Sequence, residues 1–219
     1  MIRFVFLTSL VYFLSGCSFQ SPPNEWQYKS SNAFESYTKN FLQDNKLLAK
    51  NDLVRAQEHA RMSADLTMLA RIYLGKCALN HAVGIKDSCQ EYLELSSLVQ
   101  ESSLGSYYAL LQNEMTQESI MHLPKRYQNF AHALRSKEYN KAFEAILSME
   151  PISSQLIAAS LLGEHLTLEQ KEKILTLSSF YGYKKASLFW LEQIKTTTQD
   201  AKMIEQIEKK ITILKKGIQ

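Results

Sequence analysis

The sequence predicts an all-α protein whose antiparallel helical hairpins pack as a solenoid or as an irregular bundle of about ten or eleven helices. Valine, a residue that strands favour, occurs only three times after residue 16, at Val54, Val83 and Val99. Leu, Ala, Lys, Glu and Gln are abundant instead, and all of them are good helix formers. Apolar residues also recur at steps of three and four, which is the spacing of one helical face.

In the first half of the chain, these steps predict five helices, over residues 32–48, 52–62, 64–79, 88–99 and 104–113. Two of the helices begin with the spacing of a capping box. Asn32 and Glu35 form the first pair, and Ser88 and Glu91 form the second. A polar break at residues 116–119 ends this half of the chain.

The second half is predicted to contain six helices, over residues 124–134, 138–149, 153–162, 167–181, 184–195 and 200–214. Thr167 and Gln170 form a third capping box. The last helix carries one narrow apolar stripe, made of Ile204, Ile207, Ile211 and Leu214. This stripe either docks on the rest of the chain or receives a helix of a partner protein.

Part of the second half resembles a tetratricopeptide unit. Its pattern of aromatic, small and proline positions is followed roughly by Phe130, Tyr139, Phe143, Ile146 and Pro151. The match is incomplete, because Tyr127 and Tyr139 stand where the motif has small residues. The resemblance therefore implies hairpin packing of the tetratricopeptide kind and assigns no peptide-binding residues. Other aromatic residues, such as Tyr181 and Tyr183, are expected in the core or at its rim.

The first seventeen residues read as an export signal. Arg3 precedes an apolar run from Phe4 to Phe13, which is too short to cross a bilayer and fits a secretory signal peptide. The segment Leu14-Ser15-Gly16-Cys17 resembles the lipobox of bacterial lipoproteins. This resemblance implies cleavage between Gly16 and Cys17, removal of residues 1–16, and acylation of Cys17. The alternatives are an ordinary signal peptide that happens to contain a cysteine, and an uncleaved membrane anchor.

The organisation that follows is a lipidated cysteine and flexible tether over residues 17–29, then one all-α domain over residues 30–219. Several acyl chains on one residue hold a protein firmly at a membrane. Pro22 and Pro23 suit an extended tether. By analogy with enterobacterial lipoprotein sorting, Ser18 after the modified cysteine favours the periplasmic face of the outer membrane.

The two remaining cysteines, Cys77 and Cys89, lie near the end of one predicted helix and the start of the next. If these helices are antiparallel, the cysteines can reach disulfide distance, and export to an oxidising compartment would favour the bond. The alternative is two separate buried thiols. Either role is structural.

No catalytic or metal-binding constellation is visible in the sequence. The five histidines show no metal-ligand spacing, and we expect neither a metal nor a cofactor; they are His59, His81, His122, His132 and His165. Glu164 and His165 could form an acid–base pair, but a histidine at a helix end is the simpler interpretation. Glu101-Ser102 resembles the catalytic pair of lytic transglycosylases, yet the glycine-containing segment that should follow is missing.

The predicted function is therefore that of a non-enzymatic, membrane-tethered helical scaffold that docks another cell-envelope protein. A net charge of +3 is too small to indicate nucleic-acid binding. Two alternatives remain open: an enzyme or small-ligand-binding protein that acts on cell-wall material, and a purely structural envelope lipoprotein.

Overall fold

The computed structural model describes residues 24–216 of the chain, and in this range it contains twelve α-helices, one short 3₁₀ helix and no strand. The all-α prediction is confirmed. The helices are α1 (Glu25–Leu42), α2 (Lys46–Ala60), α3 (Thr67–Ala82), α4 (Gln90–Ser96), α5 (Ser102–Leu111), α6 (Gln117–His122), α7 (Lys125–Arg135), α8 (Tyr139–Leu147), α9 (Ile152–Leu162), α10 (Leu168–Phe180), α11 (Lys184–Thr197) and α12 (Ala201–Lys215), with the 3₁₀ helix η2 (Gly163–His165) after α9.

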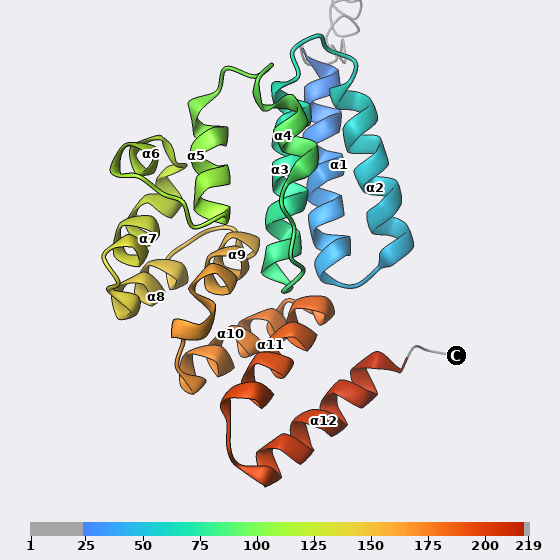
Figure 1. The fold of residues 1–219 in the computed structure, drawn as a ribbon. Helices are drawn as coiled ribbons and strands as arrows, with labels where there is room; N and C mark the ends of the chain where they lie inside the picture. Colours follow the sequence, from blue (N-terminus) through green and yellow to red (C-terminus); the bar gives the residue numbers. More distant parts are fainter. Residues whose placement is uncertain (1–23, 217–219) are drawn as a thin grey trace, which may run out of the picture.

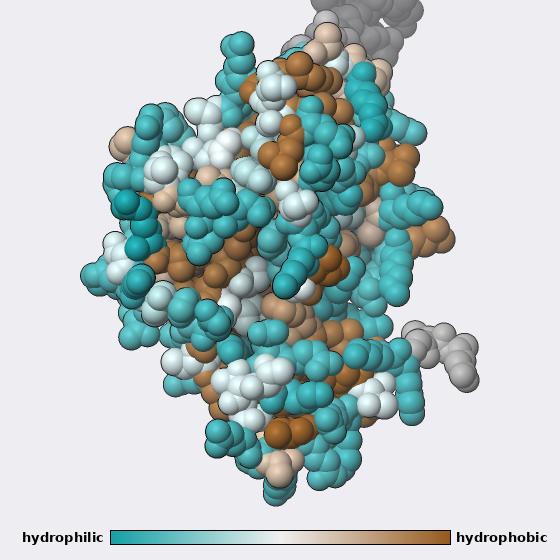
Figure 2. All heavy atoms as spheres, in the orientation of Figure 1, coloured by the Kyte–Doolittle hydropathy of each residue, from teal (hydrophilic) through white to brown (hydrophobic). Residues whose placement is uncertain are grey.

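Helix α3 is the centre of the arrangement. It contacts α1, α2, α4, α5 and α9. In Figure 1, α5 to α8 lie to the left of α3, and α10 and α11 lie below α3 and the α1–α2 hairpin. The space-filling view of the same face is mostly hydrophilic, with several separate hydrophobic patches (Figure 2).

Three helical hairpins share one kind of turn. Three residues connect α1 to α2, α7 to α8, and α10 to α11, and the middle residue is left-handed, with φ of 66° at Asp44, 58° at Lys137 and 66° at Gly182. In each turn the next residue donates its N–H to a carbonyl five residues earlier, as Tyr183 does to Ser178. This bond is typical of the Schellman motif, which ends a helix sharply. The three turns have unequal separations along the chain, unlike a regular 34-residue repeat.

The core is one large cluster that runs through most of the helices and two smaller ones at its edges. Trp190 of α11 and Phe130 of α7 are among its largest fully buried side chains. The hairpin α7–α8 buries Phe130, Phe143 and Ile146, which were the apolar positions of the tetratricopeptide-like pattern.

The predicted start of the first helix is wrong. Helix α1 begins at Glu25, so Asn32 lies inside it and does not cap it. The buried residues Ser30, Ala33 and Tyr37 show why, since the early turns of α1 already pack into the body, and Ser30 Oγ donates a hydrogen bond to the Ala56 carbonyl of α2 at 2.8 Å. Residues 25–29 therefore belong to α1 and not to the tether.

Of the two other predicted capping boxes, the structure confirms one and contradicts the other. The Thr167–Gln170 box is confirmed at the start of α10, with both reciprocal hydrogen bonds present. The Ser88–Glu91 box is wrong, because Cys89 is the residue before α4 and its side chain makes no capping bond. At α6 the sequence predicted a polar break and no helix. Helix α6 begins with a Thr116–Ser119 capping box.

Candidate functional site

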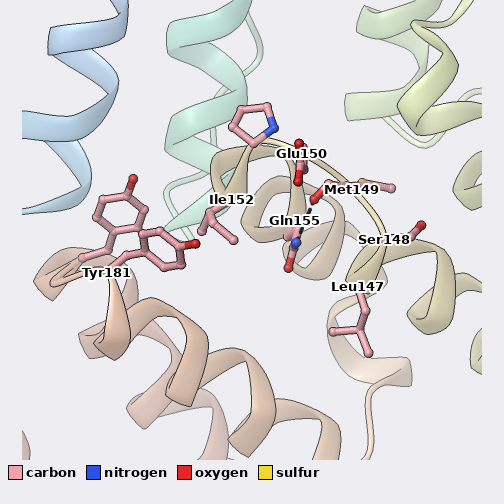
Figure 3. A pocket seen from close by; sticks show the side chains of 9 residues that line it. Leu147, Ser148, Met149, Glu150, Ile152, Gln155 and Tyr181 are labelled. Atoms are coloured by element: carbon pink, nitrogen blue, oxygen red, sulfur yellow. Dashed lines mark hydrogen bonds between the residues drawn. The ribbon is translucent and has the colours of Figure 1, made fainter.

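A hollow of about 690 Å³ lies between the α8–α9 connection and the α10–α11 turn. Figure 3 shows its two walls facing one another, with Tyr181 on one side and the segment around Met149 and Glu150 on the other. The hollow is lined by Leu147, Ser148, Met149, Glu150, Pro151, Ile152, Gln155, Tyr181 and Tyr183.

The α8–α9 connection is held in place by two side-chain donors. Gln155, which is buried on α9, donates its Nε2–H to the Met149 carbonyl at 2.7 Å (Figure 3). Arg126 of α7 donates from Nη1 to the Glu150 carbonyl at 2.9 Å. The Met149 side chain is itself buried in the core. These two bonds hold the backbone of this wall against α9 and α7.

The opposite wall is the α10–α11 turn, whose two tyrosines stack. The ring centroids of Tyr181 and Tyr183 are 5.8 Å apart, at an interplanar angle of 28°. Burial of Tyr183, together with its neighbour Tyr181, raises the pKa of the Tyr183 phenol. Tyr181 remains 44% exposed, and the adjacent Phe180 is 82% exposed. The turn thus presents aromatic surface to solvent at the edge of the hollow.

A second hollow, of about 570 Å³, adjoins the first across Pro151 and Tyr183, because both residues line both hollows. Its other lining residues are Asn32, Glu35, Ser36, Thr38 and Lys39 of α1, and Ser153 of α9. Together the two hollows form a concave surface that crosses three parts of the fold, which we name the Pro151–Tyr183 groove.

The groove is chemically mixed. Pro151 and Tyr183 lie where the two hollows meet, whereas Glu35, Lys39 and Glu150 supply charges of both signs. Aromatic rings flanked by hydroxyl and amide groups are common where proteins hold extended segments of other proteins. The arrangement can therefore bind apolar side chains and hydrogen-bond a backbone beside them.

The residues that sequence analysis weighed for catalysis are not assembled into one site. Glu101 lies just before α5, and the Arg71 guanidinium of α3 donates to both of its carboxylate oxygens, with Nη2 2.8 Å from Oε2. Ser103 Oγ donates to the same carboxylate at 2.7 Å. These bonds tie α5 to α3, so the Glu101 carboxylate has a structural role in joining them.

His59 and His165 lie in other parts of the fold than Glu101. His59 is on α2 and lines a third hollow together with Lys29 and Arg55. His165 is in η2, where its ring stacks on Tyr139 with centroids 3.9 Å apart and an interplanar angle of 6°. The neighbouring Glu164 shares the short η2 turn.

The disulfide between Cys77 and Cys89 is present and joins α3 to the start of α4, with the Cα atoms 5.3 Å apart. His81 lies next to it. The two sulfurs and one ring nitrogen of His81 all lie within 4.8 Å of one another. The sequence did not reveal this cluster, because two of its members are one helical turn apart and the third follows a loop.

The apolar stripe of α12 docks on the body of the chain. Ile207 and Ile211 are buried against Leu191 and Ile194 of α11, and Leu214 packs on the same cluster. Ile204 is partly buried. The stripe thus packs against α11, as one of its two interpretations expected.

The Pro151–Tyr183 groove was missed in the sequence, where Pro151 was part of the tetratricopeptide-like pattern and Tyr183 was expected in the core or at its rim. Cys17 and residues 1–16 lie outside the described residues. Within residues 24–216, no helix has both the length and the apolar content that a bilayer crossing requires.

Comparisons with known protein families, with curated proteins and with solved structures gave no match.

Proposed function

We propose that this chain is a lipid-anchored docking protein of the bacterial cell envelope, which holds an extended segment of another envelope protein in the Pro151–Tyr183 groove and catalyses no reaction. The observation that carries the proposal is the continuity of the two hollows across Pro151 and Tyr183. This continuity joins hollows of about 690 and 570 Å³ into one surface that a partner segment could follow.

The groove suits a protein segment because its walls come from α1, the α8–α9 connection and the α10–α11 turn, which the fold holds together. Gln155 and Arg126 hold one wall, and the stacked tyrosines form the other. A preformed surface loses little conformational entropy on binding. Stacked helical hairpins commonly use such concave surfaces to bind peptides and protein segments.

The anchor in this proposal is the acylated Cys17, inferred from the resemblance of Leu14 to Cys17 to a lipobox. Because α1 begins at Glu25, only residues 18–24 connect the anchor to the helical body. Seven residues span at most about 25 Å when fully extended. The groove would therefore work close to the membrane surface, and its partner would be a membrane protein or a protein held near the membrane.

The anchor is tested by mass spectrometry of the mature N-terminus in cells that express the full chain. The proposal predicts a first residue of Cys17 that carries acyl chains. A Cys17→Ser variant is the control, and it should lack both the acyl mass and the cleavage before residue 17. An unmodified chain, or a chain that begins elsewhere, would remove the anchor from the proposal.

The groove is tested by placing a photo-crosslinking amino acid at position 181 in living cells. We expect one envelope protein to crosslink reproducibly there, through an extended segment that peptide mapping identifies. The matched control position is Leu98, which is 65% exposed and lies between α4 and α5. Equal crosslinking of the same protein at both positions would show a contact that does not depend on the groove.

A further inference from the structure

Cys77, His81 and Cys89 surround one point at the junction of α3 and α4. Cys77 and His81 are four residues apart on α3, so both side chains project from the same face of the helix. Cys89 reaches this face from the start of α4. One nitrogen of His81 and the two sulfurs lie within 4.8 Å of one another.

The loop before Cys89 holds these residues in position through Asp87. The Asp87 carboxylate accepts hydrogen bonds from Asn80 Nδ2 at 2.7 Å and from the Cys89 N–H at 2.8 Å. The Asp87 carbonyl oxygen lies 3.0 Å from His81 Nε2. A carbonyl can only accept, so this contact places the proton on Nε2 and the lone pair on Nδ1. Metal-binding histidines are commonly oriented by such a bond.

One side-chain donor faces the sulfurs, since Gln112 Nε2 lies 3.6 Å from Cys89 Sγ, and the Asp87 carbonyl oxygen lies 3.7 Å from Cys77 Sγ. Both cysteines are buried, so a bound cation is needed to stabilise them as thiolates. His81 is only partly buried, so an ion can approach from its side. Two thiolates and an imidazole are ligands that favour zinc over magnesium or calcium.

We propose that reduction of the Cys77–Cys89 disulfide converts this cluster into a three-ligand Zn²⁺ site, formed by the two sulfurs and the His81 ring, with a fourth position open to water. A dithiol reductant supplies two electrons and two protons, which break the S–S bond and yield two thiols while the reductant becomes a disulfide. Zinc then binds both sulfurs and releases the two protons.

Zinc binding requires little rearrangement of α3 and α4. Zinc–sulfur bonds of about 2.3 Å allow two sulfurs in a tetrahedral site to lie a little under 4 Å apart. The Cα atoms of the two cysteines are already 5.3 Å apart in the disulfide. The bound ion would therefore keep α3 joined to α4 after the covalent bond is lost.

The test uses the full chain in detergent with the Cys17→Ser change, so that Cys77 and Cys89 are the only thiols. After reduction with a phosphine and removal of the excess, Zn²⁺ is titrated against a chromophoric chelator under nitrogen. We expect one ion to bind per reduced chain and none to bind to the oxidised chain. Co²⁺ in place of Zn²⁺ should give thiolate-to-cobalt absorption bands.

Two variants identify the third ligand. His81→Ala should weaken Zn²⁺ binding by at least about tenfold, whereas His122→Ala, an exposed histidine on α6, should leave it unchanged. Since His81→Ala keeps the disulfide, the melting temperature of its oxidised form shows that it folds. The absence of zinc binding, or equal binding by His81→Ala and the parent chain, would overturn the proposal.

Alkylation provides a second readout that does not depend on the chelator. Zn²⁺ should protect Cys77 and Cys89 of the folded, reduced chain from a thiol reagent, and His81→Ala should lose most of this protection. Equal rates of alkylation with and without Zn²⁺ would also contradict the site.

Discussion

The phenolic oxygens of Tyr107 on α5 and Tyr127 on α7 lie 3.2 Å apart, and their ring centroids are separated by 5.2 Å. The pair joins two helices that have α6 between them in the chain. Burial is the main reason that the pKa of each phenol is raised above its ordinary value. The Arg126 guanidinium nearby offsets only part of this effect, because loss of hydration is the largest cause at both phenols.

This pair predicts a loss of stability in alkali. Above the unfolded-state pKa of about 10, the unfolded chain releases its phenol protons while the folded chain still holds them. The folded state then binds more protons, so the free energy of unfolding falls as the pH rises. Urea unfolding between pH 8 and 11 should show this fall. The fall should be smaller in Tyr107→Phe/Tyr127→Phe, but unchanged in Tyr28→Phe, whose side chain is exposed. Equal slopes in all three proteins would contradict the argument.

A second prediction concerns the close approach of α3 to α1. A Cβ atom at Gly75 would lie 2.5 Å from Cζ of Phe34, whereas a Cβ at the helical Gly105 would meet nothing within 4 Å. Gly75→Ala should therefore lower the free energy of unfolding by about 1–3 kcal/mol, because the packed ring must move. Gly105→Ala is the matched control and should raise it by up to about 1 kcal/mol. Equal melting temperatures for the two variants would show that Phe34 moves at no cost.

A third prediction concerns the disulfide as a structural bond. Reduction of Cys77–Cys89, measured with a strong chelator present, should lower the free energy of unfolding by about 3 kcal/mol, because the unfolded chain gains the freedom of the opened loop. The Cys77→Ser/Cys89→Ser double variant should show the same lower stability with and without reductant. If reduction leaves the urea midpoint of the parent chain unchanged, the bond does not stabilise this junction.

Features that depend on neighbours in the chain could be predicted from the sequence. The start of α10 follows from Thr167 and Gln170, whose side chains bond only to the backbone of the same turn. The pairing of Cys77 with Cys89 was favoured because a short loop joins two helices there and because these are the two cysteines left after Cys17. In both cases the decisive contacts span few residues.

Other local patterns were overridden by packing. Asn32 and Glu35 have capping-box spacing, yet α1 runs through them because Ser30, Ala33 and Tyr37 are buried along the same helix. Burial of a helical face in the body stabilises a helix more than one cap does. Helix α6 was missed because its local pattern is unusual and not because packing overrode it. Ser119 takes the place of the usual Glu or Gln in its capping box.

The groove could not be predicted because it depends on which turns of the fold come together. Pro151 lies before α9 and Tyr183 lies before α11, and their meeting requires the hairpins to pack as they do. Helical periodicity indicates which face of each helix is buried, but it does not indicate which turns become neighbours.

The central claim is that the Pro151–Tyr183 groove binds a segment of another envelope protein. Its most direct test is the affinity of the purified chain for the segment that crosslinks at position 181, compared between Tyr181→Ala and the control Leu98→Ala. We predict that Tyr181→Ala weakens binding about tenfold or more, which corresponds to about 1.4 kcal/mol, and that Leu98→Ala does not. Equal affinity of Tyr181→Ala and the parent chain would contradict the claim.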